Sequence, residues 1–84
     1  MNLQQLRYVF EVARNGLNVS EAAAALHTSQ PGVSKQIKLL EGELGFDLFE
    51  REGRTLTRVT PAGKQVVERA LRILDETKNI RRLS

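Results

Sequence analysis

The apolar residues of this chain recur mostly at helical spacing, in stretches separated by short polar breaks. In the central stretch they are separated by four, three and four residues, at Val33, Ile37, Leu40 and Leu44. This spacing predicts a helix with one buried stripe. Ser29 can cap its start and Pro31 suits its first turn, while Gly45 can end it in a left-handed conformation.

A shorter Ala-rich stretch precedes this helix. Ser20 is a candidate N-cap, and Ala22, Ala23 and Leu26 follow at helical spacing. Small Ala side chains allow two helices to cross closely. The polar residues 27–29 then interrupt the pattern, so the segment from Ser20 to Leu44 is predicted to be a helix-turn-helix.

The N-terminal stretch also reads as a helix, from Leu3 to Arg14, ended by Asn15-Gly16. Leu17 and Val19 are predicted to lead into the next helix as core contacts. The expected apolar face consists of Leu3, Leu6, Val9, Phe10 and Ala13.

After Gly45 the helical period is lost. Residues 51–54 have turn character, and beyond them Leu56 and Val59 alternate with Thr and Arg residues. Two short strands joined by a turn are therefore predicted, which would form the wing of a winged helix. Arg51 and Arg54 are expected at the tip of this wing, where guanidinium groups can enter a DNA minor groove.

The last stretch opens with Thr60 as cap and Pro61 at the first helical position, and runs to about Arg82. Part of its wide apolar stripe should pack on the first helix, and the remainder should pair with a second copy of the chain. A membrane-surface helix is disfavoured because its polar face mixes acidic and basic residues. The dimerisation candidates are Val66, Val67, Ala70, Leu71, Ile73, Leu74 and Ile80.

The predicted fold is therefore mainly α: a winged helix-turn-helix of three helices and a short two-stranded β-wing, followed by a long C-terminal helix. We expect residues 1–60 to form the DNA-binding domain and residues 61–84 a linker and dimerisation helix. The chain stops at Ser84 close to the helix end, so we expect a further, effector-binding domain outside it.

The composition of the chain excludes several kinds of binding site and of protein. The 84 residues carry a net charge of +3, and nine of the 13 Lys and Arg residues lie in residues 51–84. With no Cys and one His, neither a disulfide framework nor a zinc site of the usual kinds is expected, and no cofactor is predicted. No apolar run is long enough for a membrane span and no signal-peptide pattern is present, so a cytoplasmic protein is expected.

The outward face of the central helix carries hydrogen-bonding and cationic groups near its start: Gln30, Ser34, Lys35 and Lys38. Glu41 and Glu43 come only at its end, where they would trail away from phosphates. The pattern is typical of a helix that enters the major groove of duplex DNA. An ordinary solvated helix face is the alternative.

Other functions are weighed against DNA binding. A winged helix can also serve as a protein-interaction module, and a salt titration of duplex binding separates the two. An enzyme is not expected, because Glu21, His27 and Ser29 lack an oxyanion-forming loop and a sizeable pocket. RNA binding is disfavoured because the three Phe residues are expected to be buried, which leaves no stacking platform.

The whole pattern resembles a known family. The order S-Q-P-G-V-S-K-Q-I-K-L-L-E-G-E-L-G, then L-F-E-R, then T-P-A-G and a long helix is similar to the N-terminal domain of LysR-type transcriptional regulators. The resemblance covers essentially all of the chain. Within the family, L-Q-Q-L-R-Y and T-S-Q-P-G-V-S-K-Q look most like the cysteine-regulon activators, the CysB group.

The resemblance implies a DNA-binding dimer, assembled into tetramers in the full-length protein, that can contact RNA polymerase. It implies promoters of sulfate assimilation and cysteine synthesis as targets and an acetylated serine as effector. Lys35 stands where many members carry Arg, so it lacks the bidentate fork. The DNA-contact candidates are Ser20, Thr28, Ser29, Gln30, Pro31, Ser34, Lys35, Lys38, Arg51 and Arg54.

Overall fold

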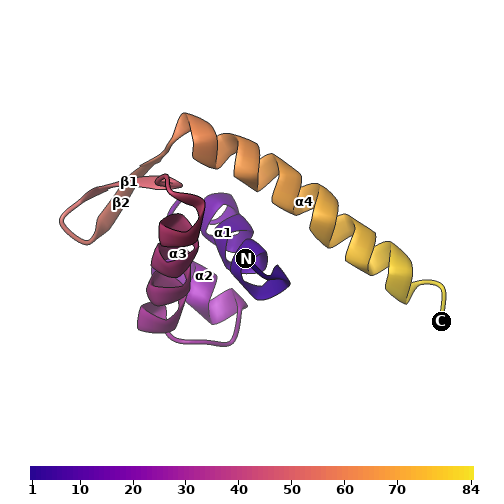
Figure 1. Cartoon of the computed structure of the whole chain (residues 1–84). Helices are drawn as coiled ribbons and strands as arrows, with labels where there is room; N and C mark the ends of the chain where they lie inside the picture. Colours follow the sequence, from indigo (N-terminus) through magenta and orange to yellow (C-terminus); the bar gives the residue numbers. More distant parts are fainter.

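The computed structural model describes residues 1–84 as four helices and one two-stranded sheet (Figure 1). The elements are α1 (Leu3–Arg14), α2 (Val19–Ala25), α3 (Gln30–Leu44), β1 (Phe49–Glu52), β2 (Thr55–Val59) and α4 (Pro61–Arg81). Helices α1, α2 and α3 form the body, the strands form a wing beside α3, and α4 projects away. The predicted fold class is confirmed.

The ends of α3 follow the local signals in the sequence. The Ser29 hydroxyl accepts a hydrogen bond from the Gly32 N–H at 3.1 Å, and Pro31 lies in the first turn. Gly45 ends the helix with a φ of 81°, in the left-handed region that glycine adopts without steric cost. All three predictions are confirmed.

The start of α2 differs from the prediction. Its N-cap is Asn18, whose side chain accepts from the Glu21 N–H at 3.0 Å, and not Ser20, which lies inside the helix. Asn and Ser cap helices about equally well, so the backbone conformation decides between them. The Asn18 backbone is extended, so its carboxamide can reach back to the first turn.

A tight turn connects α2 to α3. His27 adopts the left-handed conformation with a φ of 55°, and the Thr28 N–H donates to the Ala23 carbonyl at 3.0 Å. This is the arrangement in which glycine usually closes a helix. It reverses the chain in a few residues, so that the exposed start of α3 directly follows α2.

The core is built around α1, which contacts α2, α3 and α4. Because neighbours surround it, its buried residues span a wider arc than one stripe, and Tyr8 and Val12 are buried beside Leu6 and Val9. The predicted stripe is therefore partly wrong: Leu3 is exposed, and Phe10 and Ala13 are only half-buried. Leu17 and Val19 do pack against the core, as predicted.

The wing is an antiparallel pair with a register shift between Glu50 and Arg51. Its turn is formed by Gly53 and Arg54, so Arg51 lies within β1 and not at the tip, contrary to prediction. The prediction for Phe46 is also wrong. It is exposed in the loop before β1, because Leu48 and Phe49 take the core positions.

The first turn of α4 is pressed against the chain that enters β1. The Thr60 hydroxyl accepts from the Gly63 N–H at 2.9 Å and donates to the Asp47 carbonyl at 2.7 Å. The Thr60 N–H donates to the Leu48 carbonyl at 3.0 Å. A Cβ on Gly63 would overlap that same carbonyl oxygen, so only glycine fits there.

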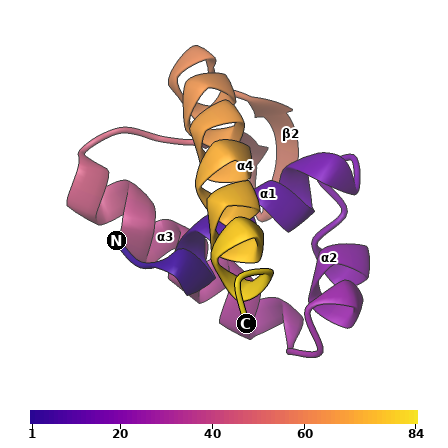
Figure 2. The same cartoon turned by 90° about the vertical axis from the view of Figure 1, so that its right-hand side faces the viewer.

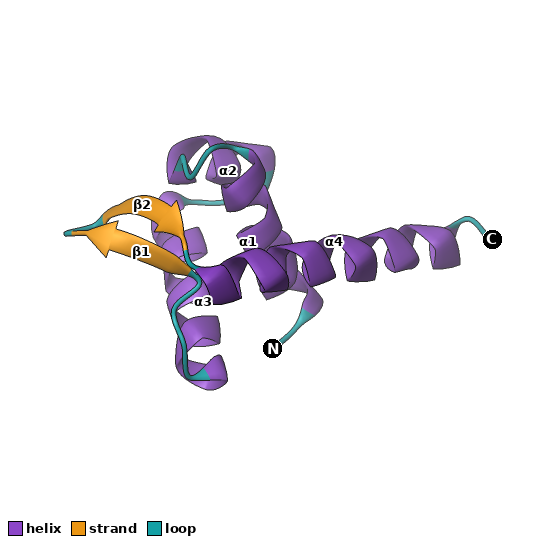
Figure 3. Cartoon of the chain, turned by 90° about the horizontal axis from the view of Figure 1, so that it is seen from above, coloured by secondary structure: helices purple, strands orange, loops and turns teal.

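Helix α4 crosses α1 and then extends beyond the body, away from the wing (Figures 2 and 3). The dimerisation candidates divide accordingly. Ala70 and Leu74 are buried within the chain, and Val66 and Val67 pack against its core. Three remain exposed: Leu71, Ile73 and Ile80. None of the helices combines the length and the apolar character needed to cross a membrane.

Candidate nucleic-acid interface

The exposed side of α3 carries a row of polar side chains. Gln30, Ser34, Lys35 and Lys38 are all solvent-exposed. Val33, Ile37 and Leu40 are buried on the opposite side, so the core fixes which residues face outward. With Arg54 of the wing turn, the four polar residues form what we call the α3–wing surface.

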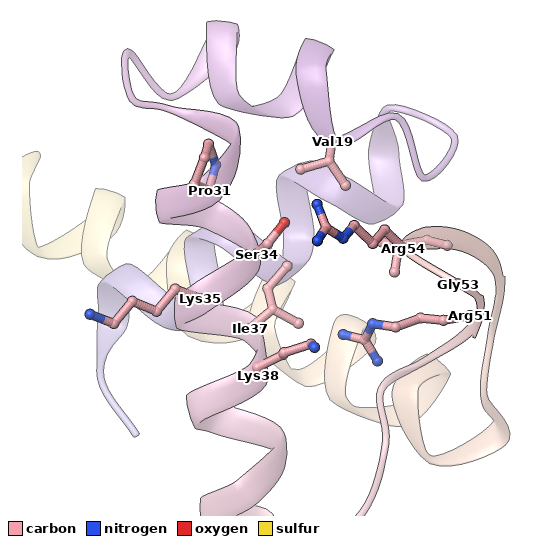
Figure 4. Close-up of a pocket in the computed structure, with 10 residues that line it drawn as sticks. Val19, Pro31, Ser34, Lys35, Ile37, Lys38, Arg51, Gly53 and Arg54 are labelled. Carbon is pink, nitrogen blue, oxygen red and sulfur yellow. The ribbon is translucent and has the colours of Figure 1, made fainter.

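A cleft of about 320 Å³ separates α3 from the wing. Ser34 and Lys38 line it from the helix, and Arg51 and Arg54 line it from the wing (Figure 4). Figure 4 shows both guanidinium groups extending from the wing toward α3, with Arg54 on the side of Ser34. Three cations thus face one cleft, which makes it attractive to a polyanion.

The two arginines of the wing differ in their partners. Arg51 is paired with Glu41, with an Nη2–Oε1 distance of 2.8 Å, and 21% of its side chain is exposed. Arg54 is exposed, and no hydrogen bond or ion pair within the chain involves it. A guanidinium without an internal partner is free to bind phosphate or a groove edge. Of the two, Arg54 is the one available to a ligand.

The other candidates lie around this surface. Ser29 and Pro31 are exposed at the start of α3, and Thr28 is half-buried beside them. The Ser29 hydroxyl accepts the capping bond, which leaves its own proton for a ligand. Lys35 borders the cleft, but its side chain extends away from the wing (Figure 4). Ser20 is exposed on α2 and is not among the residues that line the cleft.

The third arginine of the wing, Arg58, lies on its far side and is paired with an acidic residue. The Arg58 guanidinium donates to the Glu50 carboxylate across the two strands. This hydrogen bond lowers the pKa of Glu50 below its ordinary value and raises that of Arg58. The two charges neutralise each other, and because Arg51 is paired with Glu41, Arg54 is the wing arginine that has no acidic partner.

Glu41 has a role that the sequence reading missed. It is 6% exposed, and its carboxylate accepts hydrogen bonds from the Leu48 N–H and from Arg51. The signal was present in the spacing. Glu41 follows Ile37 by four residues, which places it on the buried side of α3 and not on the outward face.

The residues of the α3–wing surface are suited to binding a polar, anionic ligand, and they do not form the hydrogen-bonded arrangement of a catalytic site. The polar side chains of α3 can donate to or accept from base edges, and Lys38 and Arg54 can neutralise phosphates. The single His is exposed in the turn before α3, and no hydrogen bond within the chain joins it to Ser29 or Glu21. The spacing of exposed groups on a helix beside a wing suits a groove of duplex DNA.

Known proteins match this chain over nearly its whole length. The model of the bacterial regulatory helix-turn-helix proteins, lysR family, matches residues 3–64. The HTH-type transcriptional regulator CysB of Haemophilus influenzae is 51% identical over 81 residues, which are 96% of this chain and 25% of that protein. The regulator SsuR of Burkholderia cenocepacia is 51% identical over 84 residues, covering all of this chain and 27% of that protein.

A solved structure agrees with these relatives. The crystal structure of a CbnR DNA-binding domain in complex with DNA superposes with a TM-score of 0.84 at 40% identity, covering 94% of this chain and 88% of that one. The chain spans about a quarter of the length of the curated regulators it matches. It belongs to the lysR family of bacterial regulatory helix-turn-helix proteins.

Proposed function

We propose that this chain binds duplex DNA in a sequence-specific manner, as the operator-reading part of a LysR-type transcriptional regulator. The observation that carries the proposal is the α3–wing surface, where the side chains of Gln30, Ser34, Lys38 and Arg54 are exposed and form no ion pair or hydrogen bond within the chain. The likeness to the CbnR domain, which was crystallised with DNA, supports it. Residues 1–60 form the reading unit and residues 61–84 the linker helix.

The residues divide into readers and anchors. Gln30 and Ser34 face base edges, where a Gln can pair with the N6 and N7 atoms of adenine. Thr28, Ser29 and Lys38 hold phosphates and set the register, while Lys35 contacts a guanine or a phosphate. Arg54 enters the minor groove beside the wing.

Two copies of the chain read two half-sites. The exposed apolar residues Leu71, Ile73 and Ile80 of α4 supply the surface for a second copy. Arg69 and Arg72 alternate on this helix with Glu68 and Asp75, which suits pairing with an identical helix. Symmetric recognition helices should lie one turn of DNA apart or a multiple of it, about 34–36 Å per turn.

The target genes follow from the relatives. Identity of about half to the regulators CysB and SsuR supports promoters of sulfate assimilation and cysteine synthesis as targets. The full-length regulator would act in the bacterial cytoplasm as a tetramer, with RNA polymerase as a further partner at those promoters.

A salt titration of duplex binding tests the proposal. The logarithm of the association constant should fall linearly with the logarithm of salt concentration, by about 0.9 for each phosphate contact. Gln30→Ala should cost about 1–3 kcal/mol on the matched operator and relax specificity at one position. Lys38→Ala should weaken all sequences about equally and reduce the slope by about 0.9.

The contrary results are equally clear. Weak binding without salt dependence would favour a protein-interaction module over a DNA reader. Equal losses on every sequence for both variants would show that the division into readers and anchors is wrong.

A further inference from the structure

A single buried carboxylate joins the recognition helix to the wing. Glu41 Oε2 accepts from the Leu48 N–H at 2.7 Å and from the Phe49 N–H at 3.3 Å. Its Oε1 accepts from Arg51 Nη2 at 2.8 Å, and Oε2 accepts from Nη1 at 3.3 Å. We call the residues that meet here the joint: Glu41, Leu48, Arg51, Thr60 and Gly63.

The joint connects α3 to the start of α4 through the backbone of Leu48. The Glu41 carboxylate accepts a hydrogen bond from the Leu48 N–H. The Leu48 carbonyl in turn accepts one from the Thr60 N–H at 3.0 Å. Thr60 in turn caps α4 through Gly63. The place where β1 begins, and hence the direction of the wing, is therefore tied to one side chain of the recognition helix.

The same carboxylate decides what Arg51 can do. Arg51 lines the cleft beside Lys38 and Arg54, where an unpaired guanidinium would meet DNA phosphates (Figure 4). Its fork is instead occupied by Glu41 and by the Phe49 carbonyl at 3.3 Å. A bidentate pair of this kind fixes geometry as well as charge.

A carboxylate buried to this extent needs its hydrogen bonds to be tolerated. Here all of its partners come from the wing or the chain leading into it, and none from the body of the domain. An apolar residue at this position could pack against the core, but it could neither orient the Leu48 and Phe49 amides nor neutralise Arg51. Its contacts therefore indicate a role in the geometry of the α3–wing surface.

We propose that Glu41 is a positioning residue for DNA reading. It fixes the wing against α3 and withholds Arg51 from the phosphates, so that Arg54 makes the contact of the wing. The inference rests on the proposed DNA-binding function. It implies that Glu41 improves discrimination between sequences while limiting affinity for unrelated DNA.

Glu41→Gln tests this, because glutamine keeps the size of the side chain and an acceptor oxygen but releases Arg51. The released guanidinium should add one phosphate contact, which steepens the salt slope by about 0.9 and raises affinity for unrelated duplex. The ratio of affinities for operator and unrelated duplex should fall about tenfold. Glu43→Gln is the control for charge, since it removes one carboxylate from an exposed position of the same helix, where its partner is the N-terminal ammonium of Met1 and not the wing.

Two further measurements protect the test against misfolding and against failure of DNA binding. In Glu41→Gln/Arg51→Gln, which carries no unpaired buried charge, the slope should return to that of the unaltered chain. Amide hydrogen exchange at Leu48 and Phe49 should speed up in Glu41→Gln and stay unchanged in Glu43→Gln, with no DNA present.

The outcomes separate the two proposals. If the unaltered chain binds duplex with a normal salt slope but Glu41→Gln and Glu43→Gln behave alike, the positioning role is refuted and the proposed function stands. A fall in slope for Arg51→Gln alone would also overturn it, because Arg51 would then contact DNA directly. If the unaltered chain shows no salt-dependent binding, the proposed function fails and the inference falls with it.

Discussion

The α3–wing surface and the joint each combine residues of α3 with an arginine of the wing, yet their polar groups behave differently. At the joint, the buried carboxylate of Glu41 and the hydroxyl of Thr60 are fully engaged within the chain. On the α3–wing surface, Gln30, Lys38 and Arg54 are left without partners. Hydrogen bonding within the chain thus separates the polar groups that stabilise the fold from those that are free to bind a ligand.

The comparison is sharpest for the two arginines of the wing. They are three residues apart, and each carries a charge that could meet DNA. Arg51 forms an ion pair with Glu41, ten residues earlier in the chain, while Arg54 lies in the turn and has no acidic partner. Changes at Gly63 and Thr60 of the joint should therefore alter stability and leave the salt slope unchanged, whereas changes on the α3–wing surface should alter binding.

Gly63→Ala should have the largest effect on stability. The added Cβ would overlap the Leu48 carbonyl oxygen, a backbone atom that cannot rotate away, so α4 must shift. We expect a loss of about 3 kcal/mol in the free energy of unfolding, measured by urea denaturation. Gly42→Ala is the control: nothing lies within 4 Å of its added Cβ, and it should stabilise the exposed helix by about 0.5–1 kcal/mol. Equal effects at both sites would contradict close packing at the joint.

Thr60→Val should destabilise less. It removes the cap of α4 and leaves the buried Gly63 N–H without an acceptor, at a cost of about 1–2 kcal/mol in unfolding free energy. Thr60→Ser keeps the hydroxyl and should recover most of that loss. The salt slope of DNA binding should be unchanged in both, and a changed slope would place Thr60 at the DNA.

Arg54→Gln should show the opposite behaviour. Its thermal midpoint should match that of the unaltered chain, because the side chain has no partner to lose. The salt slope of duplex binding should fall by up to about 0.9, because a guanidinium in the minor groove displaces at most one counterion. A drop in thermal stability with no change in slope would assign Arg54 to the fold and break the comparison.

The smallest effect is expected on the far side of the wing. The hydrogen bond from Arg58 lowers the pKa of Glu50, so the pair stabilises the wing above the ordinary, unfolded-state value of about 4.5. That contribution disappears as the pH falls through the lowered folded-state value. In Arg58→Gln, a carboxyl titration followed by NMR should show the Glu50 pKa returning toward its ordinary value. An unchanged titration would mean that the pair does not form in solution.

Local signals in the sequence were sufficient for much of this fold. Ser29, Pro31 and Gly45 delimit α3, and Thr60 with Pro61 starts α4, because each acts through its own backbone or the next turn. The buried stripe of α3 followed from spacing alone. The division of the fold into three helices, wing and long helix could therefore be predicted.

What could not be predicted depends on neighbours far along the chain. Arg51 and Arg54 look alike in the sequence, and only the contact with Glu41 distinguishes them. Phe46 and Leu3 are apolar but exposed. Phe49 occupies the core position near Phe46, and α2, α3 and α4 pack on other sides of α1 than the one that carries Leu3. For α4, spacing showed a wide apolar stripe, but packing on α1 decides that Ala70 and Leu74 are used within the chain.

The most direct test of the central claim is a titration of the isotope-labelled chain with operator duplex, followed through its backbone amide NMR signals. The account predicts that the largest shift changes fall on residues 28–38 and on Gly53 and Arg54, with smaller ones at the joint. Changes concentrated along α4 or on the far side of the wing, with residues 28–38 unmoved, would contradict it.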